Sequence, residues 1–241
     1  MPIHDAGLYA TITIVTHIQS KYSRIGGTKG AIMSDGYRIA DINIGESIDE
    51  QAKLAANPDV HVRMSLAKNE MTLPEIQRQL AIDENLEVRW ALTCNPKIVP
   101  EVQKVLAQDS AYEVRQSLAQ VPGLTDVAQL LLAYDRDDFV RETLAIVPGL
   151  TSRVQSMLAH DKSVDVRAAL ATNKLDKDVQ IMLSQQEDRQ VLEALADNEW
   201  VDASIIESLT KNNDEQIAEV AQTNITERTA TTPPSFGMSL G

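Results

Sequence analysis

The 241-residue chain contains a single cysteine, Cys94, and few aromatic residues. One cysteine excludes an intrachain disulfide framework and any metal or iron–sulfur site that needs several cysteines. Aromatic residues make up 4% of the chain, and its two phenylalanines are few for the core of a β-sandwich or barrel. Long apolar runs are also absent, so no segment is predicted to span a membrane.

Positive charge is scarce, because 22 Lys and Arg residues face 35 Asp and Glu residues and the net charge is −13. Binding to nucleic acid or to an anionic membrane surface needs clustered positive charge, so neither partner is expected. The start, Met1-Pro-Ile-His-Asp, has no basic region followed by an apolar run. The sequence therefore predicts a cytoplasmic protein without a signal peptide.

What the chain does have is an internal repeat. A Val-Arg pair recurs every 26 residues, and a leucine follows each of these valines by four positions. Valine and leucine at this spacing share one face of a helix. A second leucine block recurs within each unit, for example at Leu106-Ala107, and residues such as Pro96 or Pro122-Gly123 separate the blocks. Each unit is therefore predicted to be two short helices, which bury their apolar faces only by stacking on neighbouring units. The pairs are Val62-Arg63, Val88-Arg89, Val114-Arg115, Val140-Arg141 and Val166-Arg167, with degenerate copies at Val191 and Ile217.

These units resemble HEAT-like repeats, and their short length and V-R-x-x-L-A motif are most similar to the leucine-rich-repeat-variant branch. The resemblance covers about residues 47 to 222 and implies an all-α, right-handed α-solenoid of six to seven two-helix units. It also implies that one helix of each unit is short or 3₁₀-like. HEAT-like proteins are mostly scaffolds for protein partners, which is the function that the resemblance implies. The iron–sulfur cluster of some variant-repeat proteins is not expected, because no cysteine precedes Cys94.

An acid or amide stands six residues before each arginine of the Val-Arg pairs. It falls in the turn ahead of a helix, where backbone N–H groups and the helix dipole favour negative charge. Each arginine can reach this residue or its equivalent in the adjacent unit, which favours a structural ladder of ion pairs over a phosphate-binding stripe. The ladder comprises Arg63, Asp83, Arg89, Asp109, Arg115, Asp135, Arg141, Asp161 and Arg167, with Asn57 in the first unit.

The helices with the Val-Arg pairs also present a candidate binding stripe. Positions two and six after the valine point away from the buried face on a helical wheel. In HEAT-like folds this helix lines the concave surface, so the stripe is predicted to hold a protein segment. Met64 and Trp90 are its apolar anchors, and Glu142, Glu193 and Asp197 select a basic stretch. The predicted stripe consists of Met64, Lys68, Trp90, Gln116, Gln120, Glu142, Glu193 and Asp197.

The two ends do not follow the repeat. Residues 1–46 contain β-branched, partly alternating stretches and turn residues such as Gly26-Gly27, which indicate a β-hairpin or an extended arm. This segment is a candidate cap for the solenoid, a partner-binding module or an oligomerisation arm. Residues 223–241 are predicted to be a disordered tail, with a docking peptide at its end as the alternative.

No catalytic motif, cofactor motif or metal-ligand spacing occurs among the four histidines, Cys94 or the acids. The main hypothesis is a non-enzymatic protein-interaction scaffold that binds a partner segment on its concave face. One alternative is a structural subunit of a larger assembly that uses its irregular ends. Another is a HEAT-like enzyme, such as a chromophore lyase or a DNA glycosylase, although the acidic stripe counts against the glycosylase.

Overall fold

The chain divides after Ile44, and the computed structural model describes residues 47–231 of the unit Gly45–Gly241. This described part contains fourteen α-helices and no strand. The predicted β-hairpin or arm within residues 1–46 lies outside the described residues. No helix between residues 47 and 231 is long and apolar enough to cross a membrane.

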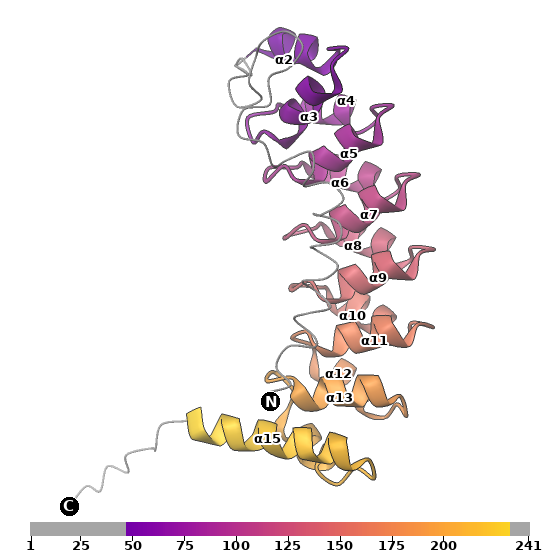
Figure 1. The fold of residues 1–241 in the computed structure, drawn as a ribbon, viewed down its shortest axis with the longest axis vertical. Coiled ribbons are helices and arrows are strands. Elements are labelled where there is room, and N and C mark those ends of the chain that lie inside the picture. Colours follow the sequence, from indigo (N-terminus) through magenta and orange to yellow (C-terminus); the bar gives the residue numbers. More distant parts are fainter. Residues whose placement is uncertain (1–46, 232–241) are drawn as a thin grey trace, which may run out of the picture. The chain divides into compact units, whose positions relative to one another are not determined.

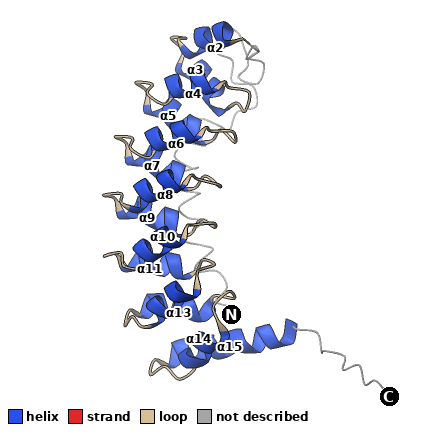
Figure 2. Ribbon diagram, turned by 180° about the vertical axis from the view of Figure 1, so that it is seen from behind, coloured by secondary structure: helices blue, strands red, loops and turns tan. Residues whose placement is uncertain are grey.

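The helices alternate between two layers of a stack, as Figures 1 and 2 show. Helices of one layer pack against their counterparts in neighbouring units and against the other layer. This arrangement confirms the predicted all-helical repeat, whereas its right-handed sense and the number of units stay predictions. The first layer contains α2 (Ile48–Ala55), α4 (Pro74–Leu80), α6 (Pro100–Leu106), α8 (Asp126–Ala133), α10 (Ser152–Leu158), α12 (Lys177–Ser184) and α14 (Ala203–Leu209). The second contains α3 (Val60–Lys68), α5 (Leu86–Thr93), α7 (Tyr112–Ala119), α9 (Asp138–Ala145), α11 (Val164–Ala171), α13 (Arg189–Asp197) and α15 (Glu215–Thr231).

Local sequence explains where these short helices begin. In the first layer, α4 and α6 begin with Pro74 and Pro100, whose fixed φ angle suits the first helical position. In the second layer, the N-cap side chains of Asn85 and Asp137 accept hydrogen bonds from backbone N–H groups two residues later. Except for α15, every helix between residues 47 and 231 has seven to nine residues and is α-helical in both layers. Of the two possibilities that the resemblance implied, a short or a 3₁₀-like helix, the described part of the chain shows short α-helices.

The core is a column of leucines between the two layers. The repeated valine and the leucine four positions later are fully buried, as at Val114 and Leu118. Burying an apolar side chain of this size stabilises the fold by about 1.5–3 kcal/mol. Because each unit contributes the same few side chains, one continuous apolar core runs through the stack. Its largest fully buried members are Leu66, Leu80, Leu92, Leu106, Leu118, Leu132, Leu144, Leu158, Leu170, Leu183, Leu195 and Ile206.

A buried glutamine in each first-layer helix from α2 to α12 bridges two units, whereas α14 has none. In α4, the Nε2 of Gln77 donates to the carbonyl oxygen of Thr72 at 3.0 Å and to that of Lys97 at 3.1 Å. Its Oε1 accepts from the backbone N–H of Val99 at 2.9 Å. One side chain thus satisfies backbone groups of its own unit and of the next, which fixes their register. The column consists of Gln51, Gln77, Gln103, Gln129, Gln155 and Gln180, and its 26-residue period up to Gln155 was overlooked in the sequence.

The turns that follow the second-layer helices are built in two ways. Asn95 is buried and its Nδ2 donates to the carbonyl oxygens of Ala67 and Asn69 in the preceding unit, at 3.0 and 2.7 Å. Elsewhere a Val-Pro-Gly sequence makes the turn, with Gly123 at φ 72° and Gly149 at φ 83°. Only glycine adopts this left-handed conformation without a steric cost.

The C-terminal helix corrects the predicted start of the disordered tail. Residues 223–231 belong to α15, which runs from Glu215 to Thr231 and packs on α13 and α14. Asn224 is buried and donates to the carbonyl oxygen of Ala196 at 2.9 Å. Arg228 donates to the carbonyl oxygens of Val201 and Asn198, both at 2.7 Å. Polar contacts hold this last stretch, so its low apolar content was misleading. Residues 232–241 lie outside the described range.

Replacing Gln129 by leucine tests the glutamine column. The substitution keeps the volume but removes contacts to Leu124, Gly149 and Thr151. We expect a loss of about 2 kcal/mol in the free energy of unfolding, because buried backbone groups lose their partners. Urea denaturation followed by circular dichroism measures it. The exposed Gln79→Leu on α4 is the control, with an expected change below about 0.5 kcal/mol. Equal midpoints for the two variants would contradict the bridging role.

Candidate functional site

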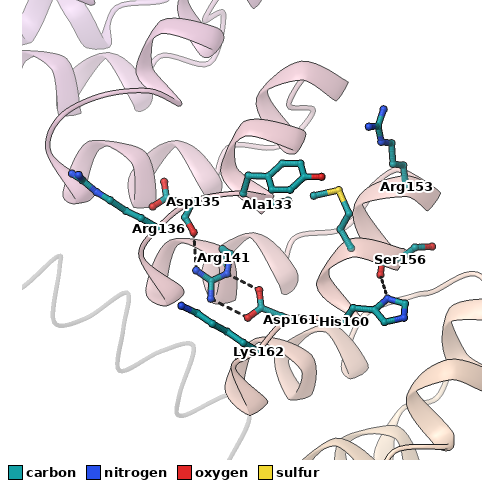
Figure 3. Close-up of a pocket in the computed structure, with 11 residues that line it drawn as sticks. Ala133, Asp135, Arg136, Arg141, Arg153, Ser156, His160, Asp161 and Lys162 are labelled. Atoms are coloured by element: carbon teal, nitrogen blue, oxygen red, sulfur yellow. Dashed lines mark hydrogen bonds and ion pairs between the residues drawn. The ribbon is translucent and has the colours of Figure 1, made fainter.

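The arginines of the Val-Arg pairs join consecutive units. Arg141 of α9 donates from Nε and Nη2 to the two carboxylate oxygens of Asp161, at 2.5 and 2.9 Å (Figure 3). Its Nη1 donates to the carbonyl oxygen of Asp135, six residues earlier, at 2.7 Å. The guanidinium therefore holds the turn of its own unit by a backbone oxygen and the turn of the next unit by a carboxylate. Of the two contacts considered from the sequence, the carboxylate of the adjacent unit is the one formed.

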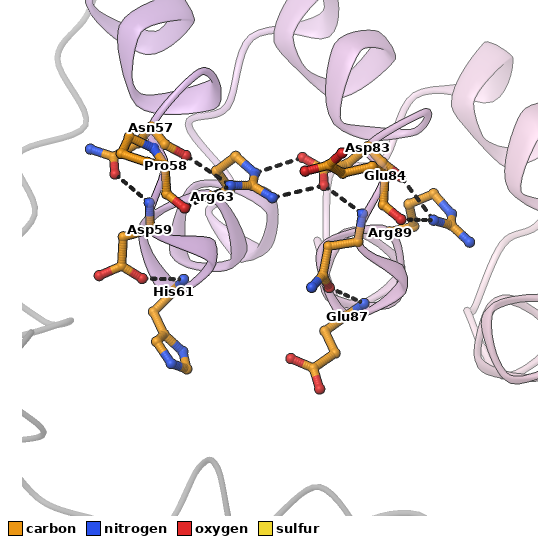
Figure 4. Close-up of polar contacts among 10 residues, drawn as sticks. Asn57, Pro58, Asp59, His61, Arg63, Asp83, Glu84, Glu87 and Arg89 are labelled. Carbon is orange, nitrogen blue, oxygen red and sulfur yellow. Dashed lines mark hydrogen bonds and ion pairs between the residues drawn. The ribbon is translucent and has the colours of Figure 1, made fainter.

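The same geometry recurs along the stack. Figure 4 shows it at Arg63, which contacts Asp83 at 2.8 and 3.1 Å, and also shows Arg89 donating to the backbone carbonyl oxygens of Asp83 and Glu84. Each aspartate also accepts a hydrogen bond from the backbone N–H two residues later, as Asp83 does from Asn85 at 2.9 Å. The series changes at Arg167, which contacts Gln186 and Asp188 instead. The remaining pairs are Arg89 with Asp109 and Arg115 with Asp135.

These arginines are largely buried and already paired, so they are not available to bind phosphate. The Arg115 and Asp135 side chains are only 5% and 4% exposed, and the guanidinium donates to Asp135, Asp109 and Ser110. The hydrogen bond to Asp135 raises the pKa of Arg115, although burial acts in the opposite direction. Burial tends to raise the pKa of Asp161, but the hydrogen bonds from Arg141 and Ser163 outweigh it and lower the pKa. The charges are paired and structural.

The predicted binding stripe is not a continuous exposed strip. Met64 and Gln116 are buried, with 7% and 6% of their surface exposed, so neither is an outward anchor. Gln116 extends to the next helix, where its Nε2 donates to Oγ1 of Thr143 at 3.2 Å. The helical wheel assumed one buried side, whereas a helix in a stack also has neighbours on both flanks. Lys68, Gln120 and Asp197 are exposed, and Trp90, Glu142 and Glu193 are half-buried.

Trp90 and its neighbours form an apolar and cationic surface on α3 and α5. The Nζ of Lys68 lies 5.2 Å from the centre of the Trp90 ring, in the position of a cation–π contact. Partial burial raises the pKa of the nearby Cys94 thiol, and Lys68 acts in the opposite direction. A raised pKa leaves the thiol protonated at neutral pH, so Cys94 is a weak nucleophile in this position.

Acidic residues gather further along the same layer. Burial raises the pKa of Glu142, and the negative charges of Asp165 and Asp138 raise it further. Within residues 47–231, no lysine or arginine pairs with Glu142. Glu193 accepts a hydrogen bond from the neutral amide of Gln216 at 2.9 Å. This face therefore carries negative charge that the described part of the chain does not neutralise.

A groove of about 700 Å³ lies on the first layer between α8 and α10. Its margin carries Arg136 and Lys162 on one side and Arg153 on the other (Figure 3). The two carboxylates in its lining, Asp135 and Asp161, are already paired with Arg115 and Arg141. The three marginal cations take part in no ion pair within the described residues. The groove is thus positively charged in a chain whose net charge is −13.

An exposed apolar patch adjoins this groove. Helix α8 reads DVAQLLLA, so it is apolar around most of its circumference although only one side faces the core. Val127 is 50% exposed on its outer side, and Tyr134 just beyond its end is 72% exposed. The sequence analysis overlooked both surfaces, and the indication it missed is that Asp126 is the one polar residue on the outer side of α8. The α8 patch comprises Val105, Val127, Leu130, Leu131, Tyr134 and Met157, of which Tyr134 and Met157 also line the groove.

The described residues contain no group of three or more His, Cys, Asp or Glu side chains that could hold a metal ion. His160 in the turn after α10 lines the groove, and its Nδ1 lies 2.8 Å from the carbonyl oxygen of Ser156 on α10.

The two-layer stack and its ladders define a helical repeat protein. One solved structure with this fold is described as a leucine-rich repeat variant with a novel repetitive protein structural motif. It superposes with a TM-score of 0.53 at 23% sequence identity, over 74% of this chain and 71% of that chain. This likeness confirms the resemblance that the 26-residue units indicated, at the level of the fold. No model of a protein family and no curated protein matches the chain.

Replacing Arg115 by leucine is expected to cost about 3 kcal/mol of stability, because it leaves the carboxylate of Asp135 buried without its partner. The matched control is Arg78→Leu, which breaks the exposed pair between Arg78 and Glu75. That change is expected to cost less than about 1 kcal/mol. Urea midpoints of both variants give the comparison. Similar losses would show that burial does not distinguish the ladder from surface ion pairs.

The lowered pKa of Asp161 predicts a pH dependence of stability. Because the folded pKa lies below the unfolded value of about 3.9, the unfolded chain binds more protons at acidic pH. The stability from the Arg141–Asp161 pair is therefore present above about pH 4 and is lost as the pH falls through the folded pKa. Asp161→Asn is expected to flatten the fall in urea midpoint below pH 4. An unchanged slope in this variant would assign the acid sensitivity to other carboxyl groups.

Proposed function

We propose that the protein is a non-enzymatic scaffold that binds a partner protein on the outer face of its second helical layer. The fold supports this at the general level, since solenoids of stacked helix pairs present extended surfaces for protein partners. The face in question carries Trp90, Lys68 and the acidic residues around Glu142, and the resemblance predicts that it is concave.

The observation that supports this proposal best is that Glu142 lies beside other acidic residues and pairs with no lysine or arginine of the described chain. Burial raises its pKa most and the negative charges of Asp165 and Asp138 raise it further, so the approach of a positive charge would relieve repulsion that is already present. A lysine or arginine from a partner gains more from such a site than from a carboxylate that is already paired. The partner proposed here is therefore a protein with a basic segment.

Trp90 gives the same face an apolar contact. Its ring is half-buried and lies beside Lys68. Aromatic residues are frequent among the anchors of protein interfaces, because they bury a large area with little loss of conformational freedom. A basic segment that follows the layer from α9 and α11 to α5 would meet the acidic cluster first and the ring afterwards. Met64 and Gln116 are not part of this surface, because they are buried.

The test is a comparison of partners captured by the full-length chain from its native extract and identified by mass spectrometry. Glu142→Lys combined with Asp197→Lys is expected to lose a partner that the unchanged protein retains. The lysine at position 142 faces Asp138 and Asp165, so we expect the variant to fold with equal or higher thermal stability. A purified basic peptide from the partner should then bind the variant about tenfold or more weakly.

The control for this experiment is Glu207→Lys on α14, an exposed position of the first layer. It changes the net charge in the same direction without touching the proposed face. If this control reduces partner capture as strongly as the double variant, the interaction depends on total charge and the proposed face is wrong. Retention of the partner by the folded double variant would also contradict the proposal.

A further inference from the structure

We infer that the groove between α8 and α10, together with the α8 patch, is a second docking site, which takes an acidic protein segment with large apolar side chains. This site lies on the first helical layer and is separate from the acidic face proposed above. It rests on the exposed apolar side of α8 and on the three cations at the margin of the groove.

The apolar part of the site marks an interface. A helix that is apolar around most of its circumference is normally buried on most sides, yet beyond Asp126 the outer side of α8 lies open in the described structure. In the equivalent positions of α4, the chain has Glu75, Arg78 and Gln79, which are all exposed and polar. The stack itself therefore does not require apolar residues there. Exposed apolar surface with a polar margin is typical of sites that bind another protein.

The extent of the patch indicates a macromolecular ligand. Val105, Leu131 and Met157 stand 26 residues apart and belong to α6, α8 and α10. Adjacent packed helices lie about 8–10 Å apart, so the patch extends over roughly 20 Å. This length exceeds that of most small molecules but matches about six residues of extended chain.

The charge of the groove determines the sign of the ligand. Arg136, Arg153 and Lys162 come from three elements, the loop after α8, helix α10 and the loop after α10. Arg136 donates one hydrogen bond to the carbonyl oxygen of Ser110 at 3.2 Å, which leaves its charge uncompensated. Carboxylates on a ligand would find three positive groups around one apolar floor. Arginine and carboxylate also pair in a bidentate geometry that adds specificity.

A second copy of this chain fits the site less well. In a twofold dimer the same patch would meet itself, which would bring Arg153 and Lys162 of the two copies together. Like charges placed across an interface cost several kcal/mol. An acidic segment of a different protein avoids this repulsion and gains from the same charges.

Fluorescence anisotropy of the full-length chain with a labelled peptide tests the site. The probe has about twelve residues, enough to cross the patch, with a Leu or Phe after every two Glu or Asp residues. A second peptide carries Gln in place of each acid, because a basic peptide would bind the acidic face proposed above. We expect the acidic peptide to bind, to bind more weakly as salt is raised, and to bind more tightly than the neutral one. Equal binding of the two peptides would overturn the inference.

Two pairs of variants locate the binding. The double variant Arg153→Glu with Lys162→Glu is expected to bind the acidic peptide about tenfold or more weakly. Lys174→Glu, at an exposed lysine outside the groove, is expected to leave the affinity unchanged. Tyr134→Ser is expected to weaken it, whereas Ile82→Ser does not. Ile82 is the matched control, because it stands two repeats earlier in the equivalent position and is 74% exposed. Equal effects within either pair would overturn the proposed location.

Hydroxyl-radical footprinting gives a readout that does not depend on substitutions. The acidic peptide should protect Tyr134 and Met157 from oxidation and leave the exposed Trp200 unprotected. Light scattering of the chain alone measures its oligomeric state and so tests whether a second copy occupies the site. A dimer that dissociates in Tyr134→Ser but not in Ile82→Ser would assign the site to a second copy and overturn the acidic segment. Loss of this site would leave the proposed function on the second layer untouched, because the two tests use different peptides and different residues.

Discussion

The structure depends on one interaction, the contact of each buried arginine with two successive turns. Arg115 holds the backbone of its own turn through Asp109 and the carboxylate of the next turn through Asp135. A buried ion pair contributes little net stability by itself, since desolvation offsets most of the attraction. Its effect is on geometry, because any other register leaves a buried charge without a partner. The ladder therefore fixes how each unit lies on its neighbour.

The apolar core alone would not provide this specificity. Successive units bury nearly the same leucines, as at Leu92, Leu118 and Leu144, so a shifted stack would bury similar apolar area. Hydrogen bonds are directional and tolerate no such shift. The glutamine column fixes the first layer and the arginine ladder fixes the turns that enter the second. Polar residues that recur in each unit thus determine the register of the stack, and the leucines stabilise it.

The repeated apolar and charged residues predicted the helices and the ladder, whereas contacts made by uncharged polar residues and by residues outside the repeat were missed. The Val-Arg pairs gave the helices, and the acids six residues before them indicated the ladder. Gln103 and its equivalents carry the same period but were overlooked, because the search followed apolar and charged residues. Gln116 was assigned to the exposed stripe because a helical wheel does not include the neighbouring helices that bury its flanks. The end of α15 was missed because Arg228, a polar residue, holds it to Asn198.

In a repeat protein the positions that depart from the repeat carry the information about binding. The stack requires valine, arginine, leucine, glutamine and aspartate at fixed places, and the structure accounts for each. It does not require Val127 or Tyr134 on the outer side of the first layer, or Arg153 beside them. Exposed apolar residues reduce solubility, and clustered cations repel one another. A surface of neighbouring units that combines both, in a chain of net charge −13, is best explained by a ligand that covers the apolar residues and neutralises the cations.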